Sequence, residues 1–372
     1  MKFSIDRNAL FDVLQKVINV VPQRSTISIT QTILIQATNA GVDLVATDLE
    51  ITMAAHVNAQ IEEPGSAAVV GRMLYEIIRE LPESTLHFEV EPENRLILRT
   101  DFGNYKIAGD NPANFPKRPE FEKQFEISLK NDVLRRLIEK TVFACSTDEL
   151  RPALTGVYFE FEEGYIRTVA TDGHRLSMMK YNEPNIQEAL GNVIISTRAL
   201  NLLLRNLNPE STTIMEIGQN HVVFRLDSTL IFARLIDEAY VDYHRVIPPE
   251  IHYEMIADTD QLMASIKRVS LFANPITLQI IMRIYRDYME IFAQDIDYGG
   301  EAQERIPCEF TGDEFVVGFN SRYLQEVLRH VDSSQVRMQF VRPDYAVLVR
   351  PVDPPENEEQ LMLLMPVRLD QV

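Results

Sequence analysis

Apolar residues at helical spacing occur three times along the chain in segments of one kind. Each segment follows a short strand-like run, and its first leucine recurs at separations of 124 and 128 residues. Side chains that repeat every three or four residues fall on one face of a helix, so we predict three equivalent amphipathic helices. The apolar positions of the three copies are Leu10, Leu14 and Val17, then Leu134, Ile138 and Thr141, and finally Leu262, Ile266 and Val269.

A polar residue precedes each of these helices and is suited to cap it. A short side-chain oxygen can accept hydrogen bonds from the free backbone N–H groups of the first helical turn. The predicted capping residues are Asp6, Asn131 and either Asp258 or Asp260.

A second helical pattern recurs with nearly the same period. It covers residues 71–81, 197–207 and 321–331. Its leucines Leu74, Leu200 and Leu324 correspond at separations of 126 and 124 residues. Between the two helices of each copy, strand-like runs lead into a turn with an aspartate, at Asp48, Asp172 and Asp295. Several features in one order at similar offsets indicate a structural repeat with the size of a compact domain.

The repeat predicts an α+β chain of three similar domains. Each domain would pack two helices on one face of an antiparallel sheet. Proline-rich stretches near 109–123 and 241–252 mark the boundaries. We therefore expect the domains to span residues 1–121, 122–248 and 249–372.

The most unusual turn lies in TVATDGHRLS, residues 168–177. Asp172 can accept hydrogen bonds from the backbone and Gly173 can adopt positive φ, so the run predicts a tight turn between two strands. After it, His174, Arg175 and Leu176 place an imidazole, a guanidinium and an apolar group side by side. The turn is therefore a candidate functional site as well as a structural one.

Composition limits the classes of function. The 372 residues are 45% hydrophobic, which is enough for two or three cores. The net charge of −19 predicts a surface that on average repels nucleic acid and anionic membranes. Two distant cysteines, Cys145 and Cys308, exclude a disulfide framework and favour a reducing cytoplasm. The start lacks a signal-peptide pattern, and no run approaches the ~20 apolar residues of a membrane span.

Basic residues on the predicted helices oppose this average charge. At about 100° per residue, the arginines of the second helices lie nearly opposite the apolar stripe. The basic positions are Arg72, Arg79, Arg198, Arg205, Arg322 and Arg329 on the second helices, with Lys16, Lys140 and Arg268 on the first. Glu76 and Glu326 share the outward face. The repeated sign still predicts a surface suited to a polyanion held by its phosphates, and an ordinary solvated helix face is the alternative.

The whole chain resembles the bacterial DNA polymerase III β subunit family, the sliding clamps. The resemblance rests on MKFSIDRNAL at the start, TDLE at 47–50, TVATDGHRL at 168–176, DYHRVIP at 242–248 and MPVRL at 365–369. It implies two chains joined head to tail in a closed ring whose helices line a hole around duplex DNA. It also implies a non-catalytic, cytoplasmic processivity subunit without cofactor or metal. Its implied partners are the polymerase α subunit, an ATP-dependent clamp loader and other proteins with a clamp-binding motif.

In this family, partner proteins insert a short peptide into a pocket between the second and third domains. Carried over to this sequence, the pocket consists of Leu154, Thr171, Gly173, His174, Arg175, Leu176, Val241, Val246, Met365, Pro366, Val367, Arg368 and Leu369. The sequence departs from the family at Val241, where proline is usual, and in the extension 370–372 beyond the usual end.

The resemblance also assigns contacts to DNA and to a second chain. Arg24 and Arg72 match DNA-contacting positions of the family. Three residues depart from the family where relatives use polar and aromatic DNA contacts, namely Asp148, Pro152 and Ala153. For ring closure, the resemblance places Leu271 and Phe272 of one chain against two residues of the other. Those two residues are Tyr105 and Ile107.

An enzyme built on the turn is the alternative from another functional class. Asp172 and His174 could act as a pair, with Ser177 as nucleophile. However, the sequence contains no GxSxG, no HExxH and no phosphate loop that ends in Gly-Lys-Ser/Thr. Its seven histidines also lack metal-ligand spacing. A scaffold that does not bind DNA is a third hypothesis, and it leaves the aligned arginines unexplained.

Overall fold

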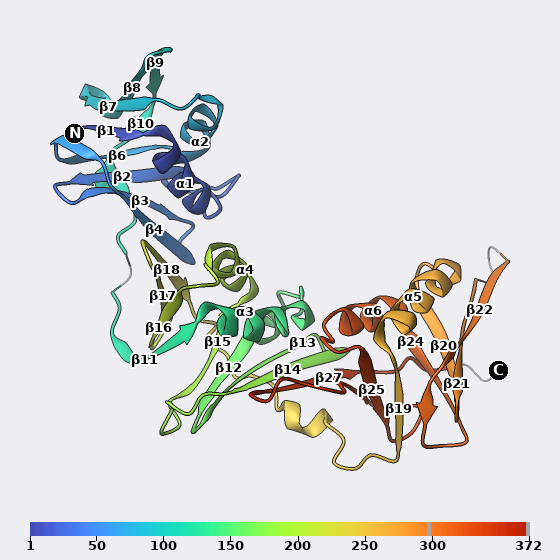
Figure 1. The fold of residues 1–372 in the computed structure, drawn as a ribbon. Coiled ribbons are helices and arrows are strands. Elements are labelled where there is room, and N and C mark those ends of the chain that lie inside the picture. Colours follow the sequence, from blue (N-terminus) through green and yellow to red (C-terminus); the bar gives the residue numbers. More distant parts are fainter. Residues whose placement is uncertain (119, 296–298, 370–372) are drawn as a thin grey trace. The chain divides into compact units, whose positions relative to one another are not determined.

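The computed structural model describes residues 1–118, 120–295 and 299–369 (Figure 1). The chain forms two compact units. Unit 1 comprises Met1–Arg135 and Arg198–Leu235, and unit 2 comprises Arg136–Thr197 and Ile236–Val372. The middle copy of the predicted repeat is therefore divided between the two units.

The described part of the chain contains six α-helices, and all six lie where the apolar spacing predicts them. They are α1 (Arg7–Val17), α2 (Gly71–Glu80), α3 (Asn131–Glu139), α4 (Thr197–Asn206), α5 (Thr259–Val269) and α6 (Ser321–Arg329). Their predicted apolar stripes are buried, for example Leu74 and Ile78 of α2, which have no exposed surface. Three of the short 3-10 helices matter for the sites: η4 (Val142–Ala144), η6 (Tyr243–Val246) and η7 (Ser270–Phe272).

Two of the three predicted caps are confirmed. Asp6 accepts hydrogen bonds of 2.9 and 3.0 Å from two backbone N–H groups at the start of α1. Asp258, rather than Asp260, caps α5 with a bond of 2.8 Å. Asn131 is instead the first residue of α3, and its Oδ1 accepts from Thr213 at 2.6 Å. This amide therefore ties the start of α3 to a neighbouring strand.

Unit 1 contains two antiparallel sheets. The first has the order β5 (Gln60–Glu63), β1 (Lys2–Asp6), β7 (Thr85–Glu91), β8 (Arg95–Thr100), β9 (Gly103–Ile107). The second has the order β10 (Gly109–Asp110), β6 (Gly65–Val70), β2 (Thr32–Thr38), β3 (Gly41–Thr47), β4 (Ile51–Val57), β18 (Thr229–Arg234), β17 (His221–Leu226), β16 (Thr212–Gly218), β11 (Lys123–Lys130). Because β4 pairs with β18, with Ala55 opposite Thr229, this sheet continues from the first copy into the second.

Unit 2 repeats this arrangement. Its large sheet has the order β15 (Gly191–Ser196), β12 (Gly156–Glu162), β13 (Tyr165–Thr171), β14 (Arg175–Asn182), β27 (Glu358–Leu364), β26 (Val347–Pro351), β25 (Gln335–Phe340), β19 (Tyr253–Asp258), β23 (Glu309–Phe310). Its small sheet has the order β22 (Gly300–Pro307), β21 (Tyr288–Asp295), β20 (Gln279–Tyr285), β24 (Glu314–Asn320). The pairing of β14 with β27 joins the second copy to the third.

The core of the third copy lies between its helices and its sheets. Alternate residues of β21 are buried, which places one face of the strand inward. Met282 and Ile291 from the small sheet meet Leu262 of α5 and Leu324 of α6, and none of the four has exposed surface. Figure 1 shows α5 and α6 on the same side of these strands. The two helices therefore pack against strands of both sheets, α5 against β21 and β19 and α6 against β24 and β27, whereas the sequence predicted a single sheet face.

The aspartate turn is repeated as predicted. Asp172 Oδ1 accepts hydrogen bonds of 2.9 and 3.0 Å from the backbone N–H groups of His174 and Arg175. Asp48 Oδ1 makes the equivalent bonds of 3.0 and 2.7 Å in the first copy. Gly173 has φ of 91°, and Leu49 takes the same left-handed conformation with φ of 81°. The third turn follows Asp295 and falls largely on residues 296–298, outside the described residues.

Candidate DNA-facing helices and peptide-binding turn

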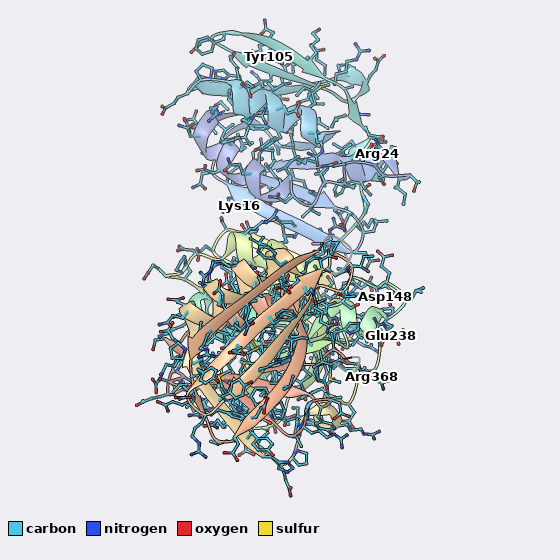
Figure 2. All side chains as sticks on the ribbon, turned by 90° about the vertical axis from the view of Figure 1, so that its right-hand side faces the viewer. Lys16, Arg24, Tyr105, Asp148, Glu238 and Arg368 are labelled. Carbon is cyan, nitrogen blue, oxygen red and sulfur yellow. The ribbon has the colours of Figure 1, made fainter. Side chains whose placement is uncertain are left out.

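The arginines of the second helices are exposed in all three copies. They are Arg72 and Arg79 on α2, Arg198 and Arg205 on α4, and Arg322 and Arg329 on α6. Figure 2 shows that Arg24, on the loop after α1, also lies at the surface. Exposed cations at equivalent positions of repeated helices can contact backbone phosphates without reading bases.

Some of these charges already have acidic partners. Arg79 pairs with Glu80 at 2.9 Å, and both side chains are well exposed. Arg198 pairs with Asp48, whose side chain is only 7% exposed. Across residues 1–118, 120–295 and 299–369, no ion pair forms at Lys16, Arg24, Arg72, Arg205, Arg322 or Arg329. The repeated helices therefore present both free and neutralised cations.

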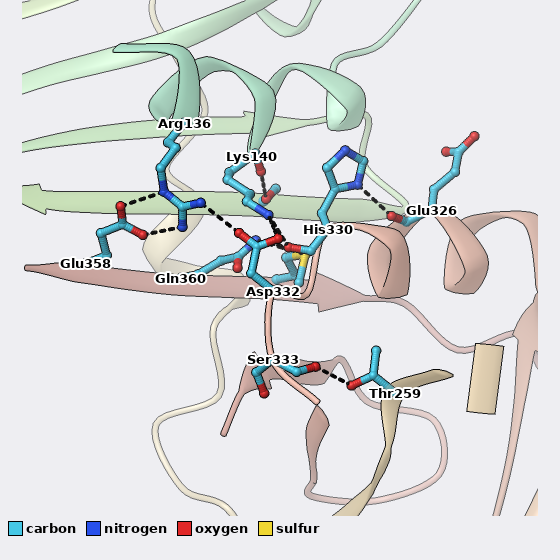
Figure 3. Close-up of polar contacts among 11 residues, drawn as sticks. Arg136, Lys140, Thr259, Glu326, His330, Asp332, Ser333, Glu358 and Gln360 are labelled. Atoms are coloured by element: carbon cyan, nitrogen blue, oxygen red, sulfur yellow. Dashed lines mark hydrogen bonds and ion pairs between the residues drawn. The ribbon is translucent and has the colours of Figure 1, made fainter. Parts of the chain in front are cut away.

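Lys140 does not belong to the basic surface that the sequence predicts. Its side chain is buried, and Nζ lies 2.5 Å from Asp332 and donates to the His330 carbonyl at 2.8 Å (Figure 3). A helical wheel gives the free face of an isolated helix. Here that face is covered by residues about 190 positions later in the chain, as the Lys140–His330 bond shows. Lys140 is therefore unavailable for DNA.

Lys140 belongs to a charged network at the end of α3. Arg136 donates to both oxygens of Glu358 and to Asp332, the latter at 2.8 Å. Burial would raise the pKa of Asp332, but hydrogen bonds from Lys140 and Arg136 outweigh burial and lower that pKa. Burial lowers the pKa of His330. The network in Figure 3 joins α3 to the end of α6 and to β27 with charges that compensate one another.

Two other charged residues differ from the sequence prediction. Glu326 does not lie on a free outward face, because it pairs with Arg175. Arg268 is exposed, but it makes two hydrogen bonds of 2.7 Å to Glu304 of β22. Glu326 therefore weakens the field of α6 less than expected, and Arg268 contributes less positive charge than expected.

A groove lies in unit 1 where the end of α1 meets α2 and the start of α4. Its volume is about 520 Å³, and Arg72, Arg198 and Tyr75 are among its lining residues. Asn19 and Gln23 contribute amide groups to the same lining. Cations and amide donors in one concave surface suit an anionic ligand.

The predicted peptide-binding turn and the C-terminal segment meet in unit 2. Beyond the last pair of β14 and β27, the N–H of Met365 donates to the His174 carbonyl at 2.9 Å. The N–H of Val367 then donates to the Gly318 carbonyl of β24, also at 2.9 Å. A Cβ added to Gly318 would lie 2.6 Å from the end of the Leu369 side chain, so the segment packs closely on this glycine. The segment 365–369 is thus held along β24 and against the turn.

Exposure separates the expected pocket residues into two groups. The exposed or half-exposed group is Gly173, His174, Val241, Val246, Met365, Pro366, Val367, Arg368 and Leu369. The buried group is Leu154, Thr171, Arg175 and Leu176. Leu176 packs with Tyr243, Leu348 and Leu363 in an apolar cluster under the turn. The first group can contact a partner, whereas the second supports it from below.

The structure changes the role expected for Arg175 as a donor to a partner peptide. Its Nε donates to Asp172 at 3.2 Å, its Nη2 donates to the Phe143 carbonyl at 2.7 Å, and Nη1 contacts Glu326. The guanidinium also lies 4.8 Å from the centre of the Tyr323 ring. Arg175 therefore connects the turn to η4 and α6, and His174 beside it keeps the exposed position.

Replacing Arg175 by Met should lower the free energy of unfolding of unit 2 by about 3 kcal/mol, because it leaves two partly buried carboxylates without their cation. Urea denaturation followed by circular dichroism measures this change. Arg286→Met is the matched control, since Arg286 pairs with Asp313 where both side chains are largely exposed, and its cost should stay below about 0.5 kcal/mol. An equal loss of unfolding free energy in the two variants would contradict the role of Arg175 in connecting the turn to η4 and α6.

Sequence reasoning missed the residues that fix the segment 236–252, which carries two residues of the expected pocket. Tyr243 donates to Glu160 at 2.7 Å and accepts from Arg167 at 3.1 Å. Tyr240 donates to a carbonyl of β13 at 3.3 Å. The only signal in the sequence was two tyrosines, Tyr240 just before the proline-rich stretch and Tyr243 within it, and nothing there names their partners. These bonds hold the segment that carries Val241 and Val246, the exposed valines of the expected pocket.

The residues expected to join two chains are partly exposed. Leu271 and Phe272 in η7 are 81% and 42% exposed, and Ile276 nearby, which the sequence did not single out, is 89% exposed. Tyr105 is half-buried on β9, the edge strand of its sheet (Figure 2). Ile107 differs from the expected interface, because its side chain has no exposed surface. It faces the core of unit 1 and cannot contact a second chain.

The geometry of the turn does not support a nucleophile. Ser177 has no exposed surface, and its Oγ donates to the Lys140 carbonyl. Burial raises the pKa of Cys145 to about 11, so its thiol stays protonated at neutral pH. Within the described residues, no three His, Cys, Asp or Glu side chains are grouped as metal ligands. No helix in that part of the chain is long and apolar enough to cross a membrane.

Three copies of one two-helix unit, with sheets continuous between copies and arginines on the second helices, define a DNA clamp fold. Family models for the N-terminal, central and C-terminal domains of the DNA polymerase III beta subunit match residues 1–119, 128–242 and 244–368. The chain belongs to the DNA polymerase III β subunit family, the non-catalytic sliding clamps of DNA replication.

Individual relatives match over the full length. The beta sliding clamp of Bacillus subtilis (strain 168) is 28% identical over 379 residues, which cover 99% of this chain and 100% of the relative. The beta sliding clamp of Pseudomonas putida is 29% identical over 373 residues, with the same coverage. The crystal structure of the sliding clamp from B. subtilis has a TM-score of 0.94 at 28% identity and covers 100% of both chains. The clamp from Pseudomonas aeruginosa bound to griselimycin also has a TM-score of 0.94 at 28% identity, over 99% of this chain and 100% of that one.

Proposed function

We propose that two copies of this chain close head to tail into a ring around duplex DNA and hold a replicative polymerase on its template. The observation that carries this proposal is the row of exposed arginines at equivalent positions of the second helices, on a chain with net charge −19. A closed ring has only to surround DNA. Phosphate contacts that exchange readily are therefore an advantage, because they permit sliding.

The proposed DNA contacts follow from exposure and pairing. The proposed contacts are Lys16, Arg24, Arg72, Arg79, Arg198, Arg205, Arg322 and Arg329. Of these, Arg79 and Arg198 already pair with Glu80 and Asp48. Arg268 is a weaker candidate because Glu304 occupies its guanidinium. None of these residues reads a base edge in this proposal, so binding is independent of sequence.

The second part of the proposal is a peptide pocket beside the turn. His174, Val246 and Met365 offer an aromatic donor and exposed apolar surface at one place, which suits a short segment with an apolar anchor. The related clamp from P. aeruginosa, which is described as bound to griselimycin, supports a ligand site on this fold. Binding there raises the effective concentration of the polymerase α subunit at the primer end. Other proteins with a clamp-binding motif would compete for the same pocket.

Ring closure and loading complete the proposal. Exposed Leu271 and Phe272 of one chain meet the edge strand with Tyr105 of the other, and two such contacts close the ring. The sequence has no phosphate-binding loop, so we assign ring opening to a separate ATP-dependent loader in the cytoplasm. The domains remain proposed at 1–121, 122–248 and 249–372, and the family matches to residues 1–119, 128–242 and 244–368 support this division.

Removing Arg72, Arg79, Arg198 and Arg205 together, each as Gln, should flatten the salt dependence of duplex binding. Removal of one phosphate contact lowers the slope of log K against log salt by about 0.9. A short labelled duplex can thread a closed ring, so fluorescence anisotropy measures this without a loader. Helical content should be unchanged, because all four side chains are exposed.

The matched control removes four arginines that lie on strands or loops. Arg95, Arg99, Arg286 and Arg342 are between 49% and 77% exposed, and their replacement by Gln changes the net charge equally. An equal slope for the two quadruple variants would show that the helices do not face DNA. Retention of the wild-type chain on closed circular DNA, with release when the circle is cut, separates a ring from a scaffold or a turnover enzyme.

A further inference from the structure

We infer that Asp48 is an internal counter-ion that competes with a DNA phosphate for Arg198 and keeps this contact weak enough for sliding. The inference rests on the proposed function, because it assigns a phosphate to the groove between α1, α2 and the start of α4. It gives a role to an acidic side chain that DNA binding alone would disfavour.

The residues that line the groove are suited to bind a phosphate. Its eight lining residues include two arginines, Arg72 and Arg198, and no aspartate or glutamate. Tyr75, Asn19 and Gln23 add hydroxyl and amide donors to the lining. A phosphate oxygen accepts from guanidinium and amide groups, and paired guanidinium groups bind it more strongly than neutral donors.

Asp48 contacts Arg198 of this lining and is fixed by its own turn. Its Oδ1 accepts from the backbone N–H groups of Glu50 and Ile51 at 3.0 and 2.7 Å. Its Oδ2 contacts Arg198 Nη2, and 7% of the Asp48 side chain is exposed. Because the first oxygen is committed to the turn, the carboxylate cannot swing away, and its second oxygen stays directed at Arg198.

The other cations of the same helices are bound differently. Arg79 pairs with Glu80 at 2.9 Å, but the two side chains are 49% and 74% exposed, so water and salt screen this pair. Arg72 has no ion pair among the described residues. Of the arginines on α2 and α4, Arg198 alone has a partner that is both buried and held by backbone hydrogen bonds, within the described chain.

The pairing has a direct consequence for binding. A phosphate that enters the groove must share or displace the Asp48 carboxylate, so Arg198 gives up one ion pair to form another. Such an exchange releases fewer bound salt ions than neutralisation of a free arginine, which lowers both the affinity and the slope of its salt dependence. The hairpin that carries Asp48 thereby sets how firmly the ring holds DNA at this groove.

The test is Asp48→Asn in the full-length chain, with a short labelled duplex as probe and salt as the variable. Asparagine keeps an Oδ1 that can accept the two backbone bonds, so the turn is preserved while the charge is removed. Relative to wild type, duplex affinity should rise at least about threefold at low salt, and the slope should steepen by up to about 0.9. In a chain that also carries Arg198→Gln, Asp48→Asn should change neither the duplex affinity nor the slope of its salt dependence.

Glu80→Gln is the matched control, because it removes one negative charge from an exposed arginine pair on α2. Its effect on affinity should stay below about 1.5-fold. If Asp48→Asn and Glu80→Gln behave alike, or if Asp48→Asn weakens binding, Asp48 does not compete with phosphate and the inference is overturned. If wild type itself fails to bind the duplex, the proposed function falls as well, so the two failures are distinguishable.

Discussion

A chain that carries Leu271→Ala together with Phe272→Ala is expected to be a folded monomer. Both side chains are exposed in the single chain, at 81% and 42%, so their truncation removes little from its core. Apolar anchors at the centre of an interface contribute on the order of 2 kcal/mol each. Truncating both should cost about 4 kcal/mol at each of the two interfaces of the ring, so the dimer should weaken by at least about a thousandfold for each interface. Sedimentation velocity at several concentrations measures this, with wild type near twice the 42.7 kDa of one chain.

The control for this variant uses exposed apolar residues outside the two expected contact elements, η7 and β9. Leu150 and Met73 are 92% and 49% exposed, so Leu150→Ala with Met73→Ala removes a similar kind of surface. This control should remain dimeric. Thermal denaturation should show intact folding for both double variants. A double variant at 271 and 272 that still sediments as a dimer at low concentration would place the interface elsewhere.

Helix positions were predictable from the sequence because the apolar spacing is local information. Leu74 and Leu324, for example, lie on stripes whose buried face depends only on helical geometry and on the presence of some sheet below. The aspartate turn was predictable for the same reason, because Asp172 bonds to backbone groups two and three residues away. The three-fold repeat strengthened each of these predictions, since one pattern occurs in three places.

Contacts between distant segments were not predictable in this way. Lys140 has the spacing of a solvent-facing residue, but its partners lie about 190 positions later. Tyr105 and Ile107 lie on the same face of β9, and the sequence does not say that Ile107 is fully covered while Tyr105 stays half-buried. Glu326 similarly finds Arg175 across 151 positions. In each case the helix or strand was predicted correctly, but the exposure of the side chain depended on the element packed against it.

The exposure of each residue decides which substitutions can test the peptide pocket. Leu176 is only 2% exposed and packs in an apolar cluster, so a charge placed there would disrupt folding before it reported on binding. Val246 is 45% exposed, and Met365 is 39% exposed next to the His174 carbonyl. Substitution of either exposed residue therefore tests the pocket with little cost to the core.

Shortening the chain after Pro366 is expected to abolish peptide binding while the dimer stays folded and still encircles DNA. The truncation removes the Val367 bond to Gly318 and the side chains that follow, among them Leu369. The neighbouring strand β27 ends earlier, at Leu364, and keeps its full pairing with β14. The melting temperature should therefore fall only slightly, whereas removal of one pocket wall should weaken binding by at least about tenfold.

Fluorescence polarisation with a labelled peptide that contains a Gln or acidic residue and a Leu or Phe anchor measures this weakening. Val246→Asp in the intact chain should weaken binding as well, because it places a charge where the anchor packs. Val70→Asp is the control, since Val70 is similarly exposed, at 41%, but lies in unit 1 at the end of β6. If the truncation lowered the melting temperature strongly and Val246→Asp bound the peptide normally, the segment 365–369 would be structural only. Equal binding by wild type, the truncated chain and Val246→Asp would remove the pocket from this part of the molecule altogether, whatever the result for the ring.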